Sequence, residues 1–399
     1  MSITRETIQS KGVISIQPTC KGCDDCVAVC PNDAITVKEL GTKHSIDFNK
    51  CVNCGQCLIT CPFGRIEDVS MVNEVKSAIG DPSKFVMVQV APAVRASLAV
   101  AFGQEEGVDA EGKMFAAMKE LGFDKVYDTT FSADLTILEE GHELIARVMK
   151  SLNVPGYEDA ESALPQFTSC CPGWVRFAEL NFPDQLEHLS TAKSPMQMHG
   201  AVIKTYGAER LGVAPSKVYS VAVMPCTAKK FECSRPEFIS SGYNDVDAVI
   251  TTRELAQMIK DAGIDFNSLE EQPCDDLMGE GTGAGVIFGN TGGVMEAALR
   301  TAYAVLSGKE LEGIEIADVR GEQGVRDASV TIPLKKEFKK ATGLDSLEVK
   351  VAIVSGAANV KSVMADVAAG NSPYHFVEVM TCPGGCVNGG GQIINHDIL

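Results

Sequence analysis

The sequence has no long uninterrupted apolar run, and its basic residues are too few to balance the acidic ones. Its most apolar stretch, residues 85–102, is interrupted by Gln89, Pro92 and Arg95, so we expect no membrane span. The N-terminus lacks the apolar segment of a secretory signal, which predicts a cytoplasmic chain by default. The net charge of −18 repels phosphate backbones and argues against nucleic acid as a partner.

The composition is that of a globular protein. Hydrophobic residues make up 45% of the chain and charged residues 22%, which excludes a disordered or fibrous protein. The length of 399 residues corresponds to two or three domains.

The chain contains fifteen cysteines, and their number and placement decide its interpretation. Without an export signal we do not expect disulfides, so the cysteines should be metal ligands or buried thiols. Eight of them lie within the first 61 residues and the other seven are spread from position 170 to position 386. This distribution predicts a small, metal-rich head and a larger body.

The head contains two copies of one cysteine motif. Residues 20–31 read CKGCDDCVAVCP and residues 51–62 read CVNCGQCLITCP, and each is the C-x2-C-x2-C-x3-C-P run of two-cluster ferredoxins. Paired C-x-x-C runs also bind structural zinc, but zinc runs normally stop at two cysteines. Because the fourth cysteine of a run ligates the other cluster, the predicted ligand sets are Cys20, Cys23, Cys26 and Cys61 for one cluster and Cys51, Cys54, Cys57 and Cys30 for the other.

These motifs predict an α+β ferredoxin-like domain over residues 1–70 that binds two 4Fe-4S clusters and relays electrons. A polar linker with one amphipathic helix is expected over 71–84. From residue 85 to 399, strand-like apolar runs alternate with helical patterns, which predicts an α/β body with two lobes of parallel sheet and a cleft between them.

Three segments of the body place cysteine beside proline or glycine: FTSCCPGW at 167–174, MPCTAKKFE at 224–232 and EVMTCPGGCVNGGGQ at 378–392. Together they supply five cysteines, one more than a 4Fe-4S cubane needs. Either Cys170 or Cys171 can therefore bind while its neighbour stays free for proton transfer. The alternative for Cys170 is that it is only a small buried apolar residue.

With these three motifs behind a ferredoxin head, the sequence resembles the catalytic subunit of FeFe hydrogenases, most closely the large subunit of the compact two-subunit form. The resemblance implies that Cys171, Cys226, Cys382 and Cys386 hold a 4Fe-4S subcluster. It also implies that Cys386 bridges to a diiron unit carrying CO, cyanide and azadithiolate, which completes the H-cluster. The implied activity is reversible H2 oxidation and proton reduction, with electrons relayed through the two head clusters.

The resemblance further assigns residues around the diiron unit. It implies that Lys229 donates to a cyanide, whereas we expect the adjacent Lys230 to be solvated. The residues that it places on the wall of the diiron pocket are Ala91, Pro92, Met224, Phe288 and Met380. At Ala93 and Met196 the sequence departs from relatives that carry polar groups there. Cys233 and Cys274 match no ligand position and are expected to be structural thiols.

A proton route is expected to start at Cys170. Glu140 and Glu143 lie three residues apart on one face of a predicted helix, with Arg147 four residues further on. An isolated pair of this kind is usually a solvated charged face. The resemblance instead implies a proton pathway from Cys170 through Glu140, Ser190 and Glu143.

Two other functions fit parts of this pattern, namely a non-catalytic iron-sulfur assembly factor related to hydrogenases and an H2 sensor. Cys170, Lys229 and the run Gly389–Gly391 favour the enzyme.

The expected partners of this enzyme are H2 and protons, a redox protein such as ferredoxin or a cytochrome, and a separate small subunit, since only seven residues follow Gln392. Export to the periplasm is possible through a partner that carries an export signal.

Overall fold

The computed structural model describes residues 4–37, 41–279, 281–311 and 324–394. The chain forms two compact units. The first unit comprises Met1–Ser132, Pro195–Thr282 and Cys386–Leu399, and the second comprises Ala133–Ser194 and Gly283–Gly385. The predicted head therefore lies within the first unit, while the predicted body is shared by both. The boundaries at residues 70 and 84 stay a prediction.

The head is built from two similar halves. Helix α1 (Arg5–Lys11) precedes strand β1 (Ile14–Ile16), helix α2 (Asp25–Ala28) and strand β2 (Ile35–Thr36), and the second half consists of β3 (Ser45–Ile46), α3 (Gln56–Thr60) and β4 (Ile66–Asp68). Strand β1 pairs antiparallel with β4, and β2 with β3. Each half thus carries its cysteine run on a loop and a short helix between two strands, which is the expected α+β arrangement.

A four-stranded parallel sheet forms the core of the first unit. Its strand order is β6 (Lys125–Asp128), β5 (Phe85–Val90), β8 (Val218–Met224) and β9 (Ala248–Thr251). Five consecutive residues of β5 are buried, and β8 and β9 are almost wholly buried. Such continuous burial is typical of a parallel sheet with both faces covered.

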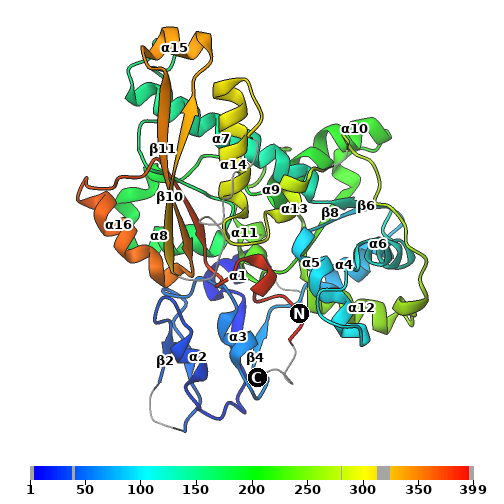
Figure 1. Cartoon of the computed structure of the whole chain (residues 1–399). Coiled ribbons are helices and arrows are strands. Elements are labelled where there is room, and N and C mark those ends of the chain that lie inside the picture. The colour runs from blue at the N-terminus through cyan, green and yellow to red at the C-terminus, as the bar shows by residue number, and fades with distance from the viewer. Residues whose placement is uncertain (1–3, 38–40, 280, 312–323, 395–399) are drawn as a thin grey trace. The chain divides into compact units, whose positions relative to one another are not determined.

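Helices cover this sheet, among them α4 (Val72–Ile79), α5 (Pro92–Leu98), α6 (Glu111–Glu120) and α12 (Thr252–Asp261) (Figure 1). Helix α4 lies within the predicted linker, and it buries Val75 and Ala78 in the core of the sheet. The other helices of the first unit outside the head, including 3-10 and π turns, are η1 (Ala99–Phe102), α9 (Pro195–Val202), η3 (Ile203–Gly207), α10 (Ala208–Leu211), η4 (Pro215–Lys217), α11 (Ala228–Ser234), η5 (Phe266–Ser268) and η8 (Cys386–Asn388).

The second unit has a mixed sheet, which corrects the expectation of two parallel lobes. Strands β11 (Ser346–Ser355), β12 (Phe376–Met380) and β7 (Gln166–Phe167) are parallel, but β10 (Val325–Pro333) runs antiparallel to β11. The short connection through α15 (Lys336–Thr342), at the tip of the β10–β11 pair in Figure 1, allows a hairpin and not a crossover. Most of β10 is not buried, as expected for an edge strand.

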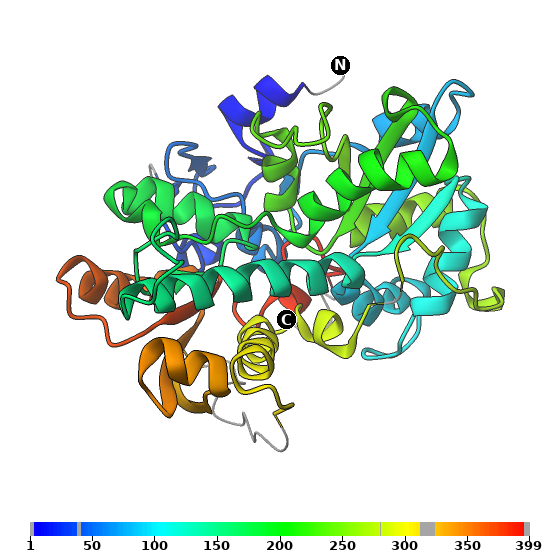
Figure 2. The ribbon, with the colours of Figure 1, turned by 90° about the horizontal axis from the view of Figure 1, so that it is seen from above.

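The helices of the second unit pack around this sheet. The longest is α7 (Thr130–Ser151), which begins in the first unit and is the long helix in Figure 2. The others are α8 (Pro172–Asn181), η2 (Pro183–His188), α13 (Gly283–Ile287), α14 (Gly293–Ser307), α15, η7 (Ala357–Asn359) and α16 (Val360–Ala368). Side chains of α7 and α14, among them Leu144, Val148 and Leu299, share one apolar cluster with Ile353 and Phe376 of the sheet.

The segments predicted to form the site follow the carboxyl ends of strands in the two sheets. In the first unit β5 ends just before Ala91 and β8 ends two residues before Cys226. In the second unit β7 ends three residues before Cys170 and β12 ends two residues before Cys382. Within each sheet these strands are parallel, so their carboxyl ends lie at one edge, which is where α/β sheets place ligands.

The apolar cluster of the second unit generates a stability prediction. Leu299 is fully buried, whereas Leu344 of the same unit is 40% exposed. Leu299→Ala should lower the free energy of unfolding by about 2–5 kcal/mol because it leaves a cavity, and Leu344→Ala by roughly 0.5 kcal/mol or less. Thermal unfolding followed by circular dichroism under anaerobic conditions measures both, and equal shifts would contradict the described packing.

Candidate metal centres and proton-transfer residues

The first cysteine group of the head surrounds a single hollow. Cys20, Cys23, Cys26 and Cys61 line it together with Lys21, His44, Phe63, Arg65 and Ile66. Burial, together with the negative charges of Cys20 and Cys23, raises the pKa of Cys26 to about 11. Thiolates crowded in this way are stable only beside a cation, so the residues fit an iron-sulfur cluster.

Two thiols of the second cysteine group, those of Cys54 and Cys57, also have strongly raised pKa values. Burial raises the pKa of Cys57 well above its usual range, and Cys54, Cys51 and Cys30 add repulsion. The pKa of Cys54 is raised by the same cause, with Cys51, Cys30 and also Cys226 contributing. The head's second group therefore lies within electrostatic range of Cys226, which belongs to the body.

Backbone amides approach the sulfur atoms of both groups. The N–H groups of Ala34, Asn53 and Arg65 donate to the sulfurs of Cys30, Cys51 and Cys61 at 3.2, 3.4 and 3.3 Å, respectively. Such donors stabilise thiolate charge and tune the reduction potential of a bound cluster. The head thus has both the thiols and the donors that two clusters require.

The body cysteines are divided between the units. Cys226 and Cys386 belong to the first unit, and Cys170, Cys171 and Cys382 belong to the second. Cys171 is the residue before helix α8, whose first residue is Pro172. Each unit thus supplies two of the four cysteines expected to hold the subcluster, and their joint ligation stays a prediction.

Within the first unit, glycines bring the Cys226 turn and the Cys386 segment together. The N–H of Gly391 donates to the carbonyl of Pro225 at 2.8 Å. A Cβ on Gly389 would stand 2.1 Å from that carbonyl, and one on Gly391 would stand 2.9 Å from the amide nitrogen of Cys226. Only glycine permits this approach, which explains the Gly389–Gly391 run.

The two lysines that follow Cys226 both lie on the buried helix α11. Lys229 is nearly buried, and its Nζ lies 2.8 Å from Oε2 of Glu232. The expectation that Lys230 is solvated is wrong, because its side chain is fully buried and its Nζ donates to Asp68, Val69 and Glu254. The sequence carried no signal for this, since its carboxylate partners lie far away in the chain.

Contacts within the second unit shape the surroundings of Cys171. Its Sγ lies 3.2 Å from Oγ1 of Thr381, the residue before Cys382. A Cβ on Gly173 would stand 2.8 Å from the same Thr381 oxygen, so the start of α8 packs tightly on the end of β12. The second unit therefore brings its two predicted ligand segments together.

The residues expected to wall the diiron pocket are also divided. Ala91, Pro92 and Met224 belong to the first unit, and Phe288 and Met380 to the second. All except the partly exposed Pro92 are buried. Ala93 and Met196 are buried too, and the backbone carbonyl of Met196 accepts from Gln89 at 2.9 Å.

Cys170, Cys233 and Cys274 remain outside these predicted ligand groups. Cys170 is buried, and it directly follows Ser169 in the sequence. Burial raises the pKa of Cys233 to about 12. It also raises the pKa of Cys274, to which the charge of Asp128 adds. The last two thiols thus strongly favour the neutral form.

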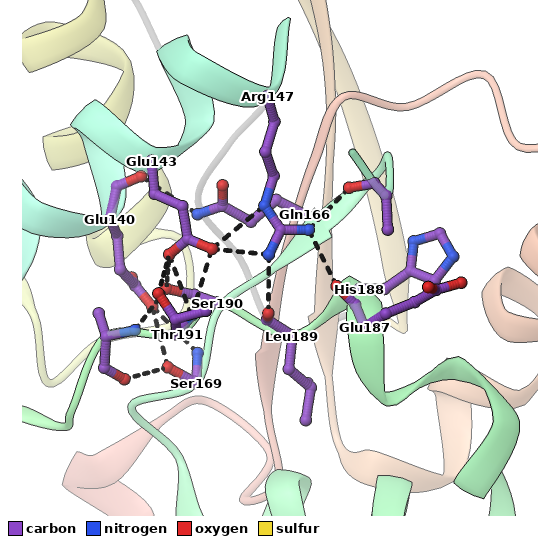
Figure 3. Close-up of polar contacts among 12 residues, drawn as sticks. Glu140, Glu143, Arg147, Gln166, Ser169, Glu187, His188, Leu189, Ser190 and Thr191 are labelled. Carbon is purple, nitrogen blue, oxygen red and sulfur yellow. Dashed lines mark hydrogen bonds and ion pairs between the residues drawn. The ribbon is translucent and has the colours of Figure 1, made fainter. Parts of the chain in front are cut away.

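Glu140 is the innermost carboxylate of a polar chain in the second unit (Figure 3). Its Oε1 accepts from the backbone N–H of Ser169 at 3.0 Å and from the Ser169 hydroxyl at 3.3 Å. Burial raises the pKa of Glu140 to about 7, although the Ser169 amide and the Ser190 hydroxyl oppose the shift. A carboxyl with this pKa can take up and release protons at neutral pH.

Ser190 connects this carboxyl with Glu143. Its hydroxyl donates to Oε2 of Glu143 at 2.7 Å, and the N–H of Thr191 donates to the same oxygen at 3.0 Å. Figure 3 shows Glu140, Ser190 and Glu143 converging from two separate segments. The structure therefore brings together the two glutamates and the serine predicted from the sequence.

Arg147 anchors the outer end of the chain. Its guanidinium donates to Oε1 of Glu143 through Nη2 at 2.6 Å and Nε at 3.1 Å. It also donates to the backbone carbonyls of Ala163, Glu187 and Leu189. Sequence reasoning missed Ser169 and Thr191, although each adjoins a residue that it had selected.

Comparisons with known proteins agree with this geometry. The family model described as "Iron only hydrogenase large subunit, C-terminal domain" matches residues 84–390, and the 4Fe-4S dicluster domain matches residues 19–65. The chain belongs to the iron-only hydrogenase family. The predicted resemblance and fold class are confirmed, and the enzyme class and cofactor class, 4Fe-4S clusters with an H-cluster, are those of this family.

Individual relatives are similar over most of the chain. The periplasmic Fe hydrogenase large subunit of Nitratidesulfovibrio vulgaris is 50% identical over 95% of this chain and 86% of that protein. Iron hydrogenase 1 of Clostridium pasteurianum is 44% identical over 89% of this chain and 66% of that protein. The solved structure of the FeFe hydrogenase HydA1 from Chlamydomonas reinhardtii has 38% identity and a TM-score of 0.72, covering 82% of this chain and 85% of that one.

A non-hydrogenase relative is more distant. Cytosolic iron-sulfur assembly component 3 of Bos taurus is 34% identical over 89% of this chain and 73% of that protein. The alternative of an assembly factor is therefore represented among the relatives, but the named hydrogenases are closer.

The raised pKa of Glu140 generates a pH prediction. Its carboxyl should be neutral below about pH 7 and ionised above it, so difference infrared spectra should show a protonated carboxyl band that fades with a midpoint near 7. Glu140→Gln should remove this band and slow proton transfer roughly 100-fold. Buried Glu378, whose pKa is also raised to about 7, should leave a second band in the variant.

The adjacent Glu139 provides a matched control because its side chain is exposed. Glu139→Gln should retain both the band and the rate. If Glu140→Gln leaves the spectra and the rate unchanged, Glu140 does not carry protons.

Proposed function

We propose that the chain is a hydrogenase that catalyses the reversible reaction H2 ⇌ 2 H+ + 2 e−. The observation that carries this proposal is the buried polar chain of Ser169, Glu140, Ser190 and Glu143, which begins beside Cys170. A solvated charged face would not bury Glu140 or seat Glu143 between a serine and an arginine.

We assign the twelve motif cysteines to three iron-sulfur centres. Cys20, Cys23, Cys26 and Cys61 would hold one head cluster and Cys30, Cys51, Cys54 and Cys57 the other, while Cys171, Cys226, Cys382 and Cys386 would hold the H-cluster. When bound, the H-cluster supplies an iron position that binds H2 and a nearby amine that exchanges the proton. The protein's contribution is then orientation, charge and exclusion of water.

The other residues of the site would transfer protons or donate to the bound cofactor. Cys170 would exchange a proton with the cofactor and Glu140 would accept it, since the Ser169 amide already orients the Glu140 carboxylate. Ser190 would pass the proton to Glu143, whose side chain is 13% exposed. Lys229 would donate to an anionic ligand of the iron, a role suited to a compact ammonium.

Electrons would pass through the head. Cys54 lies within electrostatic range of Cys226, whereas Cys23 is exposed. A redox partner, either a ferredoxin or a cytochrome, would therefore meet the protein near Cys23. The net charge of −18 favours a partner with a basic docking surface.

The alternative is a non-catalytic assembly factor or an H2 sensor. Such a protein needs the cubane cysteines but no proton route from a thiol that does not bind the cluster. Cys170, the polar chain next to it and the higher identity to named hydrogenases favour the enzyme.

A pair of cysteine variants tests this function. Cys170→Ser should nearly abolish H2 turnover while the iron content and the infrared bands of CO and cyanide stay unchanged, because a hydroxyl is a far weaker acid than a thiol. Cys386→Ser should instead lose those bands, since the thiolate of Cys386 is the proposed link to the diiron unit.

Full turnover by Cys170→Ser would reduce Cys170 to a packing residue. An absence of CO and cyanide bands from the matured wild-type protein with intact cubanes would refute the catalytic proposal itself.

We also infer a separate small subunit that could determine the compartment, because the relative with 50% identity is named a periplasmic large subunit. Within the described parts of the chain, none of the helices has the length and apolarity that a bilayer span needs. Co-expression with a small partner encoded nearby should yield a stable complex with higher activity than the chain alone. A fully active, monomeric chain in light scattering would contradict this inference.

A further inference from the structure

A fully buried cation joins the head to the rest of the first unit. Nζ of Lys230 donates to Oδ2 of Asp68 at 2.6 Å, to the carbonyl of Val69 at 2.6 Å and to Oε2 of Glu254 at 2.7 Å. These acceptors use all three ammonium protons. Asp68 ends the last strand of the head, and Glu254 belongs to helix α12.

A second cation extends the same network. Arg253 donates to Oδ1 of Asp68 at 3.0 Å, and it also donates to the carbonyls of Gly390 and Gln392 at 2.8 and 2.7 Å. The four-charge network is defined as Lys230, Arg253, Asp68 and Glu254. It has two positive and two negative groups, so its formal charge is balanced.

The network ties together the segments that follow three proposed cluster ligands. Asp68 lies seven residues after Cys61, Lys230 lies four after Cys226, and Gly390 lies four after Cys386. All of these residues belong to the first unit. No other function that we have assigned uses this network.

The segments held by the network meet beside the head's second cysteine group. The hydroxyl of Thr227 donates to the carbonyl of Asn53 at 2.7 Å, and the amide of Gln56 donates to the carbonyl of Asn388 at 3.0 Å. Gly55, with φ of +75°, lies so close that a Cβ would stand 2.6 Å from Thr227 Oγ1 and 3.0 Å from Gly390 Cα. The backbone around Cys54 thus rests directly on the segments that carry Cys226 and Cys386.

We propose that the four-charge network positions the head's second cluster against the Cys226–Cys386 side of the H-cluster and so sets the path for electrons between them. This inference rests on the proposed ligand assignment. A buried ion network often contributes little net stability, because desolvation offsets its attraction. Its geometric effect is larger, because displacing any of the four groups leaves a buried charge unpaired.

The test uses the full chain prepared without the diiron unit, so that only the three cubanes are present. With the clusters reduced, electron paramagnetic resonance should show a spin–spin interaction between the second head cluster and the cubane bound by Cys226 and Cys386. Lys230→Met, which keeps the length of the side chain but removes its charge, should abolish or clearly reduce that splitting at unchanged iron content. Lys76→Met is the matched control, because Lys76 forms a half-exposed pair with Asp261 in the same unit, and it should leave the splitting intact.

A second variant separates positioning from folding. Lys230→Met combined with Asp68→Asn removes one charge of each sign and should recover thermal stability relative to Lys230→Met, but the splitting should stay altered. Wild-type splitting in either variant overturns the proposal and leaves the network a purely stabilising element. Because this measurement requires no H2 turnover, failure of the hydrogenase assignment would appear separately, as missing CO and cyanide bands in the matured protein.

Discussion

The crowding of buried thiols is the constraint on which the first unit depends. The head has only a few buried apolar residues, such as Ile8, Val13 and Leu58, around two groups of four cysteines. Burial and mutual repulsion hold the thiols of Cys26, Cys54 and Cys57 in the neutral form unless cations neutralise them. Bound iron can therefore neutralise the thiolates and also fill the interior of the head. Metal binding then becomes part of the folding free energy of the head.

The residues proposed to carry protons and those proposed to hold the electron-relaying clusters lie in different units. Glu140, Ser190, Glu143 and Arg147 belong to the second unit, whereas the eight head cysteines and the four-charge network belong to the first. The residues proposed to carry protons are joined by short hydrogen bonds, as a proton hop requires. The segments that carry the proposed cluster ligands instead meet through close backbone packing, as at Gly55 and Gly390, which leaves no room for side chains between them.

Both units bury ionisable side chains, but the groups that surround these side chains differ. Burial raises the pKa of Glu140 to about 7, so it can change its charge at neutral pH. Lys230 is surrounded by carboxylates and a carbonyl, which stabilises a permanent charge. The first arrangement suits a group that must exchange protons, and the second suits a fixed anchor.

The sequence by itself determined the chemistry of this protein. Ligand spacing is a local property, so the repeated cysteine runs predicted the iron-sulfur head and the three body motifs indicated the family. The proton-pathway residues followed only from the resemblance to that family. The α/β character of the body was also readable, because hydrophobic periodicity is local. The tertiary structure alone decided the antiparallel β10, the burial of Lys230 against Asp68 and Glu254, and the contacts of Ser169 and Thr191 with the glutamates. Each of these depends on partners distant in the chain, and whether a charge is solvated or buried is set by those partners and not by its neighbours in sequence.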